Sequence, residues 1–454
     1  MTRHARDASP SGGPEPRVDP KRPADPKVKA MRQERDPLKR AAMVLGPGLV
    51  TGASDDDPSG IGTYAQTGAK YGYQFLWTTL LMLPMMISVQ YICAKIGLVS
   101  GKGLASVFKD RYSARVVYPV VLAMVIANTI NAGADIGAIA AALNMLIPIP
   151  AVLFVIPVGI AIALIQLFGS YQLIARIFKW LALALLAYIG AALFAHPEIG
   201  AVIAGSLIPS LHLDAGSIGI LVALLGTTIS PYLFFWQASQ EVEDQKSMGR
   251  RRLWQRQGAS KTELRFALWD TVAGMAFSEM VAYFIILATG ATLFVSGKTD
   301  IQSATDAAQA LRPVAGDASA LLLAIGLIGA GILAVPILTA SAAYGVADAF
   351  GWKGSLDATP LNARRFYGVI VVASLVGIAI NFLGIDPIQA LVATAILNGL
   401  LAAPVLILVM RVSSDRQVMG ERTNGRWLNV LGWATTVVMA GAAIALIVVT
   451  LLPS

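Results

Sequence analysis

The sequence predicts an all-α polytopic membrane protein, and three observations support this class. The chain has 454 residues, of which 56% are hydrophobic, and its mean hydropathy is +0.65. Only 14% of the residues are charged, whereas soluble domains carry about 25%. Apolar stretches long enough to cross a bilayer recur along most of the chain. The net charge of +8 lies mostly in the connections between them and does not indicate nucleic-acid binding.

Residues 1–40 are a basic, proline-rich segment that precedes the first apolar stretch. The segment has almost no large apolar side chains, so it cannot bury enough surface to fold alone. It also lacks the apolar core of a secretory signal peptide. We expect a disordered cytoplasmic tail, and we favour this over a segment that binds anionic lipid. Residues 41–454 then form the transmembrane domain.

Eleven apolar stretches are candidates for membrane-spanning helices, each of which needs about 20 mostly apolar residues. The first and the sixth are interrupted by polar residues and proline. Two of the divisions between stretches depend on Pro148 and Pro150, and on Gly384 and Pro387. The predicted spans are residues 41–69, 73–98, 116–143, 149–169, 172–195, 216–240, 266–295, 318–347, 366–384, 388–411 and 428–452.

Lys and Arg gather in alternate connections between the predicted spans. The connection around residues 246–265 holds seven of them, whereas residues 196–215 contain Glu198 and Asp214 but no Lys or Arg. Positive residues stay on the cytoplasmic side of a membrane. With the basic tail inside, this alternation predicts an inner-membrane protein with a cytoplasmic N-terminus and an outside C-terminus.

Three consecutive aspartates, Asp55, Asp56 and Asp57, interrupt the first predicted span and are followed by Pro58. A charge at membrane depth costs roughly 2.5 kcal/mol or more, so it is kept where it pairs, faces water or binds an ion. Proline cannot donate a backbone hydrogen bond. The pattern predicts a helix broken to form a cation site. The alternative is a loop that caps the helix, but residues 41–54 are too few to cross the membrane.

The sixth predicted span has a similar interruption between Gly226 and Pro231. A plain proline kink would explain Pro231 by itself, since such kinks are common in membrane helices. The two interruptions correspond, however, if residues 41–195 and 216–411 are inverted repeats and residues 428–452 an extra helix. Interrupted helices at matching positions indicate the substrate site of a transporter.

The chain resembles the NRAMP family of divalent metal transporters. Gly46-Pro47-Gly48, followed by Asp57-Pro58, resembles the first helix of that family, and the likeness extends over most of residues 41–410. Further similar pieces are Gln90 with the segment 95–105, Ala134-Asp135 and Arg364-Arg365. The resemblance implies eleven or twelve helices in a LeuT-type 5+5 inverted repeat, with metal bound between unwound helices one and six.

Three parts of the chain depart from the family pattern. The family's Asp-Pro-Gly-Asn reads Asp57-Pro58-Ser59-Gly60 here, and its Met-Pro-His reads Ser230-Pro231-Tyr232. The acid that follows the helix-three Asp by three residues is Ala138. The pattern resembles the divergent NRAMP-related magnesium transporters. The loss of the thioether removes a bias towards transition metals, and the smaller side chains predict a roomier site.

The predicted ligands all bind through oxygen. Asp57 is the first choice for a direct ligand because it aligns with the family's metal-binding Asp, and we expect Asp55 or Asp56 to face an access vestibule. The other ligand candidates are Asp56, Thr227, Thr228 and Ser230. Residues expected around the site or along the ion pathway are Asp55, Gly60, Tyr232, Asn398, Asp135 and Gln237.

These residues predict a transporter that imports a divalent cation, Mg²⁺ with Mn²⁺ also accepted, as its substrate and that needs no cofactor. Uncoupled transport is expected, because Tyr232 and Ala138 replace titratable groups; Asp135, Asp270 and Glu279 remain as possible proton carriers. The alternatives are a proton-coupled Mn²⁺/Fe²⁺ transporter, a coupled carrier of a cationic organic solute, and a metal sensor. No nucleophile–base pair or zinc motif indicates an enzyme. The partners are the cation and the lipid bilayer; the sequence is compatible with a monomer but does not set the oligomeric state.

Overall fold

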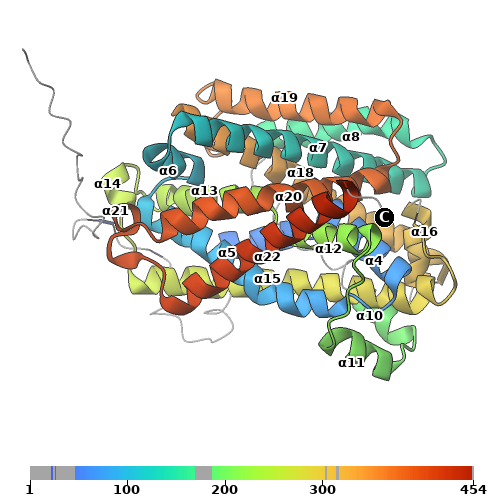
Figure 1. Ribbon diagram of the computed structural model, residues 1–454. Helices are drawn as coiled ribbons and strands as arrows, with labels where there is room; N and C mark the ends of the chain where they lie inside the picture. The colour runs from blue at the N-terminus through green and yellow to red at the C-terminus, as the bar shows by residue number, and fades with distance from the viewer. Residues whose placement is uncertain are drawn as a thin grey trace, which may run out of the picture.

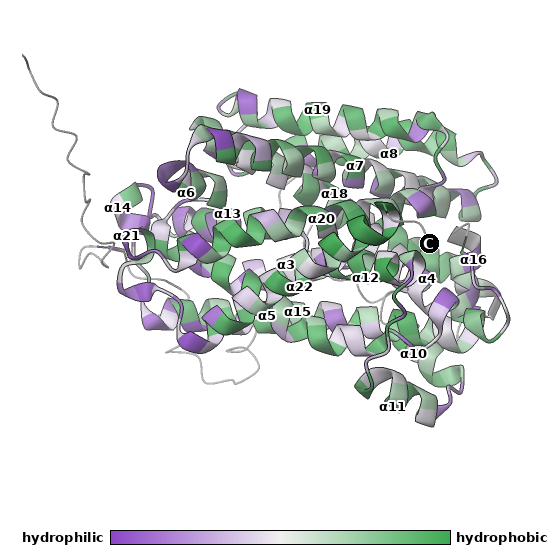
Figure 2. Cartoon of the chain, in the orientation of Figure 1, coloured by the Kyte–Doolittle hydropathy of each residue, from purple (hydrophilic) through white to green (hydrophobic). Residues whose placement is uncertain are grey.

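The computed structural model of the protein describes residues 22–23, 26, 46–168, 187–301, 304–312 and 316–451. Within these ranges every regular element is a helix. Most long helices run side by side along one axis (Figure 1). Hydrophobic residues cover the sides of this bundle, and hydrophilic residues gather towards its ends, especially the end with α14 (Leu253–Arg256) and α21 (Arg416–Met419) (Figure 2). Such sides are suited to contact with lipid.

Among the described residues, nine helical segments are long and apolar enough to cross a membrane. They correspond to nine of the eleven predicted spans. The first span is divided into two short helices, and only α10 of the fifth, 172–195, lies within the described residues. The helices that form or connect the spans are α3 (Pro47–Asp55), α4 (Pro58–Tyr71), α5 (Leu76–Ser100), α6 (Leu104–Arg111), α7 (Ala114–Leu146), α8 (Ala151–Phe168), α10 (Ala187–Phe194), α11 (Ile199–Leu207), α12 (Ala215–Thr228), α13 (Pro231–Ser247), α15 (Lys261–Thr289) with the π-helix η1 (Gly290–Phe294), α16 (Ala304–Ala308), α18 (Ser319–Phe350), α19 (Arg364–Ile380), α20 (Pro387–Ser413) and α22 (Arg426–Leu451). The tail, 1–40, lies outside the described residues except for residues 22–23 and 26.

Both divisions that depended on proline are confirmed. α7 ends at Leu146 and α8 begins at Ala151, on either side of the Ile-Pro-Ile-Pro segment. Between α19 and α20, Gly384 has a φ of 74°, which glycine adopts without strain. The Asp386 side chain then accepts hydrogen bonds from the amides of Ile388 and Gln389 and caps α20.

The connection 196–215 is more structured than expected, because it contains the short helix α11. One face of α11 is docked on the bundle: the Ser206 hydroxyl lies 2.9 Å from the Tyr283 hydroxyl. A Cβ on Gly205 would lie 2.2 Å from the carbonyl oxygen of Tyr73. This close approach leaves α11 lying against the start of α5.

The first and sixth spans are both unwound where predicted. α3 ends at Asp55, Asp56 has φ −79° and ψ 49°, and the extended Asp57 caps α4. α12 ends at Thr228, and the extended Ser230 precedes α13. Pro58 and Pro231 occupy the first positions of α4 and α13, where the missing proline N–H has no helical partner to lose.

Glycine contacts hold the first half of each broken helix against a neighbour. A Cβ on Gly52 of α3 would lie 2.2 Å from the backbone of Gly274 in α15. A Cβ on Gly226 of α12 would lie 2.3 Å from the amide nitrogen of Gly399 in α20. Small residues let membrane helices pack this closely, so α3 and α12 are fixed in position while the chain beyond them unwinds.

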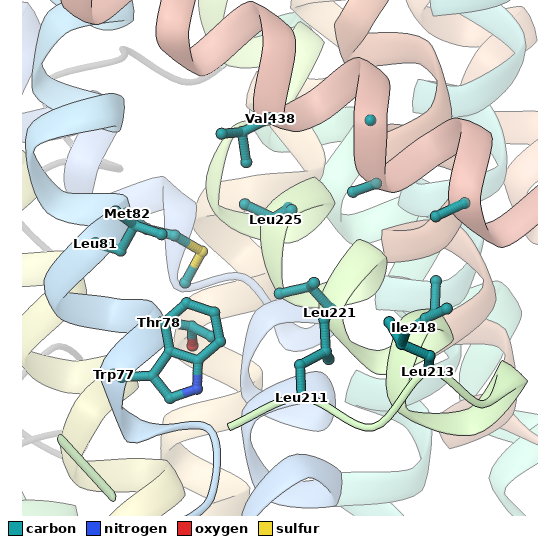
Figure 3. A pocket seen from close by; sticks show the side chains of 13 residues that line it. Trp77, Thr78, Leu81, Met82, Leu211, Leu213, Ile218, Leu221, Leu225 and Val438 are labelled. Carbon is teal, nitrogen blue, oxygen red and sulfur yellow. The ribbon is translucent and has the colours of Figure 1, made fainter. Parts of the chain in front are cut away.

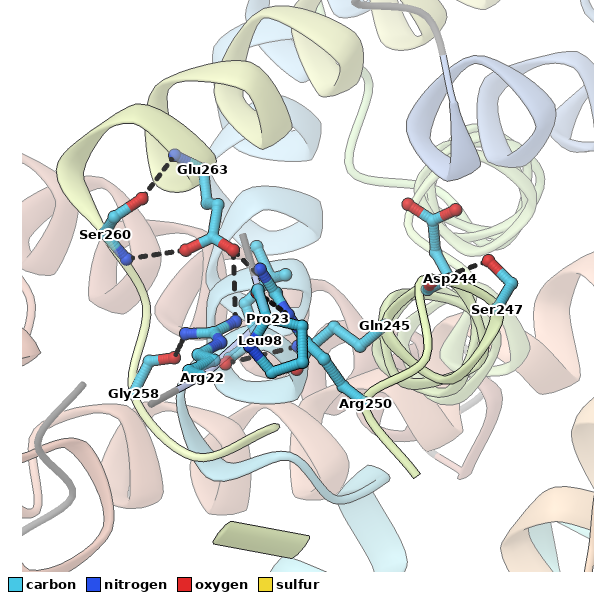
Figure 4. Close-up of polar contacts among 10 residues, drawn as sticks. All are labelled: Arg22, Pro23, Leu98, Asp244, Gln245, Ser247, Arg250, Gly258, Ser260 and Glu263. Atoms are coloured by element: carbon cyan, nitrogen blue, oxygen red, sulfur yellow. Dashed lines mark hydrogen bonds and ion pairs between the residues drawn. The ribbon is translucent and has the colours of Figure 1, made fainter. Parts of the chain in front are cut away.

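At the α14 end of the bundle, a buried charge cluster joins Arg22 of the tail to the start of α15 (Figure 4). Glu263 lies 3.1 Å from Arg22 Nη2 and 2.7 Å from Arg250 Nη1. Arg22 also donates to the Gly258 carbonyl, and Arg250 Nε donates to the carbonyl of Pro23 at 3.1 Å. This cluster connects the tail, the segment between α13 and α15, and the first turn of α15.

Candidate cation site at the two helix breaks

Asp57 lies at the centre of the first break and is buried against α7. Its Oδ1 accepts hydrogen bonds from the Gly60 amide and the Ser59 hydroxyl, both at 2.7 Å. Its Oδ2 accepts one from Asn131 Nδ2 at 3.2 Å. A carboxylate has about four lone-pair positions. Three protein donors therefore leave Oδ2 able to accept one more partner, such as a cation.

The two breaks lie next to each other. Ser59 Oγ is 3.4 Å from Thr227 Oγ1. The hydroxyl of Tyr64, in the second turn of α4, lies 3.2 Å from Thr228 Oγ1. The predicted residues Thr227 and Thr228 are thus brought close to the Asp57 end of α4, and hydroxyl groups line the contact.

Ser230 uses its hydroxyl locally. Its Oγ lies 2.6 Å from the carbonyl oxygen of Gly226 and 2.9 Å from that of Thr227. The hydroxyl can donate to only one of the two carbonyls at a time, but it is close enough to donate to either. Ser230 therefore satisfies backbone groups that the unwound helix would otherwise leave free.

Asp55 and Asp56 face α15 and are fully buried, whereas the sequence suggested that one of them faces an open vestibule. The Ser278 hydroxyl lies 2.6 Å from Asp55 Oδ2 and 3.3 Å from Asp56 Oδ1. The unwound backbone at Asp56 turns the side chains towards this helix. The second oxygen of each aspartate, and both oxygens of the adjacent Glu279, have no hydrogen-bond partner among the described residues.

The buried carboxylates have no basic side chain paired with them among the described residues. The ion pairs between described residues involve none of Asp55, Asp56, Asp57 and Glu279. A buried carboxylate without compensation is strongly unfavourable. In the described part of the chain, however, no group of three or more His, Cys, Asp or Glu side chains is placed to hold a metal ion. A cation here would thus also need hydroxyl, amide or carbonyl oxygens, or water.

The space beside Gly60 is narrower than its small size suggested. A Cβ on Gly60 would lie 3.1 Å from the Asp55 carbonyl oxygen and 3.3 Å from Thr227 Oγ1. These contacts are tight, so a side chain here would require its neighbours, which include Thr227 of the second break, to shift slightly. The expected enlargement of the site is therefore not found at this position.

Tyr232 connects the two broken helices. Its hydroxyl donates to the carbonyl of Ser54, in the last turn of α3, at 3.0 Å. Its own carbonyl accepts a hydrogen bond from the Ser341 hydroxyl of α18 at 2.7 Å. Tyr232 thus satisfies one of the carbonyls that the end of α3 leaves free.

Gln237 lies well inside α13, because this helix continues to Ser247, beyond residue 240 where the predicted span ends. Its side chain is fully buried. Gln237 Oε1 accepts a hydrogen bond from the Thr51 hydroxyl of α3, and its Nε2 donates to Glu241 Oε1 at 3.0 Å. Gln237 and Glu241 lie one turn apart on the same face of α13.

Two predicted pathway residues are buried on other helices. Asp135 lies four residues after Asn131 on α7, so both occupy the same face. Asn398 lies on α20, and its Nδ2 has no hydrogen-bond partner within the described residues. The structure shows no hydrogen bond between Asn398 and Asp57.

Asp270 and Glu279 do not form a pair in the structure. Asp270 accepts hydrogen bonds from the amides of Gly46, Gly48 and Leu49 at 2.6–3.0 Å, which satisfies the first turn of α3. Glu279 lies about two and a half turns farther along α15, beside Ser278 and the aspartates Asp55 and Asp56. Asp270 therefore has a structural role at the helix start.

Asn131, Ser59 and Ser278 contact the aspartates but were not predicted as site residues. The spacing of Asn131 and Asp135 in a mostly apolar helix was the one available signal for Asn131. Ser278 precedes Glu279 and had no comparable signal. Both come from helices far from the first break in sequence.

The comparisons with known proteins agree with this arrangement. The family model described as natural resistance-associated macrophage protein-like (Nramp) matches residues 48–449. A divalent metal cation transporter, MntH of Klebsiella pneumoniae (strain 342), is 26% identical over 414 residues, which cover 90% of this chain and 94% of the relative.

Two solved structures show the fold. A manganese transporter of Eremococcus coleocola, in complex with an aromatic bis-isothiourea substituted compound, has a TM-score of 0.72 at 17% identity, covering 92% of this chain and 88% of its own. Mhp1, a nucleobase-cation-symport-1 family transporter, has a TM-score of 0.56 at 13% identity, covering 90% and 94%. The fold is the LeuT type, with the first and sixth spans unwound. The chain belongs to the Nramp family of membrane transporters of divalent metal cations.

Proposed function

We propose that this transporter imports Mg²⁺, accepts Mn²⁺, and moves the cation without a proton. The observation that carries the proposal is the set of groups at the two breaks. The Ser59 hydroxyl contacts Asp57, the Thr227 hydroxyl lies next to that of Ser59, and the Thr228 hydroxyl lies next to that of Tyr64, so the ligands on offer are hard oxygens. Mg²⁺ prefers one or two carboxylates and keeps several waters. Mn²⁺ accepts the same ligands.

The substitution in the second break supports the lack of coupling. Tyr232 stands where the family has a histidine, and its hydroxyl is used by the Ser54 carbonyl. Among the other candidate proton carriers, Asp270 is engaged by three backbone amides. A cation would then enter down its electrochemical gradient, because each positive charge gains about 2.3 kcal/mol per 100 mV of membrane potential.

Purified protein in liposomes tests the proposal. Uptake of Mg²⁺ and of Mn²⁺ is followed together with internal pH, for wild type and for Asp57→Asn. The Asn side chain can still accept the bond from the Gly60 amide and cap α4, so loss of uptake in a folded variant reports the charge. Uptake of both ions at constant internal pH supports the proposal. Manganese uptake with acidification and without magnesium uptake contradicts it.

A proton-coupled transporter of Mn²⁺ is the second candidate; the names of the relatives given above include a manganese transporter, which favours the ion but carries no information on coupling. The same assay separates the two, because coupling predicts acidification that follows Mn²⁺ uptake. In that case Glu279, whose carboxylate is buried beside Asp55 and Asp56, becomes the first residue to replace.

We further propose that the α14 end of the bundle is cytoplasmic, as the Lys and Arg alternation predicts. The one natural cysteine, Cys93, is buried, so the background of thiol labelling is low. Ser210→Cys and Ser247→Cys, both at exposed positions, would be labelled in intact cells with a membrane-impermeant maleimide. Ser210→Cys should react at once and Ser247→Cys only after permeabilisation; the reverse order contradicts this orientation.

A further inference from the structure

A ladder of stacked aromatic side chains lies where the start of α7, the end of α18 and the start of α19 meet, next to α6 at the α14 end of the bundle (Figure 1). The rings of Tyr118 and Phe350 are stacked with their centres 5.2 Å apart and an angle of 7° between them. Trp352 stacks on Phe350 at 5.2 Å, and the Arg365 guanidinium lies 5.3 Å from the centre of the Trp352 ring. The ladder therefore ends in a cation–π contact.

The turn at Gly351 builds the middle of this ladder. Gly351 ends α18 with a φ of 70°, a left-handed conformation that glycine adopts without strain. The chain turns sharply at such a helix end, and this turn lets Trp352 lie on Phe350. A Cβ on Gly351 would lie 3.8 Å from Nζ of Lys109, which comes from α6. A second cation therefore lies beside the turn that joins Phe350 to Trp352.

The exposed face of α7 gives the depth of the ladder in the membrane. Tyr118, Leu122 and Ile126 are 40%, 59% and 49% exposed, and their spacing of four residues puts them on one face of the helix. Because Leu122 and Ile126 are apolar, this face is suited to contact with acyl chains. Arg115, which is also exposed, precedes Tyr118 by three residues. Tyr118 therefore lies at the level where aromatic side chains meet lipid headgroups.

The surroundings of the ladder are basic. Residues 109–118 and 350–365 contain six Lys or Arg but only two Asp. One of the two acids, Asp110, is paired with Lys102 at 2.6 Å, and one of the six cations, Arg111, is paired with the N-cap of α21. The other five cations are exposed and belong to no ion pair between described residues: Lys109, Arg115, Lys353, Arg364 and Arg365. This excess of positive charge beside an acyl-chain surface is complementary to an anionic lipid headgroup.

We propose that this surface binds an anionic phospholipid, whose headgroup phosphate contacts Lys109 and Arg365 and whose acyl chains lie along Tyr118, Leu122 and Ile126. A phosphate accepts strong, charge-assisted hydrogen bonds from Lys and Arg. A free phosphate ion would use the cations alone, whereas a lipid also covers the exposed apolar face of α7. Each Lys or Arg near an anionic membrane surface strengthens binding about five-fold. The two cations together therefore give a clear preference over a zwitterionic lipid.

The test uses full-length protein in nanodiscs of equimolar phosphatidylcholine and phosphatidylglycerol. Two preparations have this same composition and differ only in which lipid carries brominated acyl chains, which quench nearby tryptophans. The chain has eight tryptophans, so the Trp352 contribution is the difference between each protein and the same protein with Trp352→Phe. Trp77, measured in the same way, is the control tryptophan. It lines an apolar groove between α5, α12 and α22 that has no Lys or Arg in its lining (Figure 3).

In wild type, brominated phosphatidylglycerol should quench Trp352 several-fold more than brominated phosphatidylcholine does, whereas the two lipids should quench Trp77 equally. Lys109→Gln and Arg365→Gln, both at exposed positions, should each reduce this excess about five-fold, and the double variant should abolish it.

Arg416→Gln is the matched control, because it removes an exposed charge from α21 at the same end of the bundle; it should leave the excess unchanged. Gel filtration confirms that each variant is folded and monodisperse. Equal quenching of wild-type Trp352 by the two lipids would overturn the proposal. It is also overturned if the double variant keeps the excess, or if Arg416→Gln reduces it as much as the double variant does.

Discussion

Ser59 Oγ lies 3.4 Å from Thr227 Oγ1, and this contact joins the two unwound segments, which are 168 residues apart in sequence. Thr227→Val keeps the shape of the side chain but removes the hydroxyl. We expect the KM for Mg²⁺ to rise several-fold in liposome uptake, while the loss of one hydrogen bond costs only about 1 kcal/mol of stability. Thr436→Val on α22, which removes a buried hydroxyl bonded within its own helix, is the control. An unchanged KM in Thr227→Val would exclude this hydroxyl from the site.

Asn131 donates to Asp57 Oδ2, and its removal should affect transport more than stability. Asn131→Leu leaves that oxygen without its protein donor, which costs about 1–3 kcal/mol if the carboxylate stays charged. We expect a large fall in Mg²⁺ uptake. Asn128→Leu, one turn earlier on α7, removes a bond to the Leu338 carbonyl and should lower the melting temperature while uptake per folded molecule is kept. Equal uptake by the two variants would contradict a role for Asn131 in positioning Asp57.

The contact between Gly52 and Gly274 should not tolerate a methyl group. The added Cβ would lie 2.2 Å from backbone atoms that cannot move aside. Overpacking of this kind costs typically 1–3 kcal/mol, about the scale that decides whether a marginal protein folds. We expect Gly52→Ala to lower the melting temperature in detergent sharply. Gly219→Ala on α12, whose Cβ meets only one side-chain atom at 3.9 Å, should leave it nearly unchanged.

The charge cluster of Arg22, Arg250 and Glu263 should contribute to stability because it is buried (Figure 4). Glu263→Gln leaves two arginines without their carboxylate, and breaking a buried pair in this way costs about 3–5 kcal/mol. The exposed pair of Lys102 and Asp110 is the control, since exposed pairs contribute about 0–1 kcal/mol. Thermal unfolding of Glu263→Gln and Asp110→Asn measures the difference. Equal melting temperatures would mean that the buried cluster adds nothing.

Asp214 should make the start of α12 sensitive to acid. Hydrogen bonds from the Ser217 amide and hydroxyl lower the pKa of the Asp214 carboxyl below its ordinary value. Its stabilising contribution is therefore complete above the ordinary pKa and is lost as the pH falls through the lowered value. Asp214→Asn keeps an acceptor for the cap but does not titrate. The melting temperature of wild type should fall relative to that of Asp214→Asn only in this acidic range. If the melting temperatures of the two proteins change with pH in the same way, Asp214 does not stabilise the start of α12.

The sequence was sufficient to predict the fold class and the position of both breaks. Asp, Pro and Gly in apolar spans identify where a membrane helix cannot continue, and this information is local. The boundaries between the third and fourth spans and between the ninth and tenth spans could also be predicted, because the backbone preferences of Pro148, Pro150 and Gly384 end helices. The helix α11 was missed because its nine residues are too few to register as a span.

The environment of each aspartate could not be predicted from the sequence. The backbone angles at Asp56 decide which helix each carboxylate faces, and an unwound segment has no fixed periodicity from which to derive them. Ser278 reaches Asp55 from 223 residues away. The space beside Gly60 cannot be read from the sequence for the same reason: whether a small residue opens a cavity depends on what packs against it, here Thr227.

The anchoring of α3 has a mechanical consequence. Asp270 holds three amides at the start of this helix, and Gly52 lies directly on Gly274. α3 and α15 therefore move as one rigid unit. A rearrangement that exposes Asp57 must then change the backbone angles at Asp56 or break the hydrogen bond between Tyr232 and Ser54. A covalent cross-link between α3 and α15 should then leave transport unchanged, whereas a cross-link between α3 and α13 should block transport.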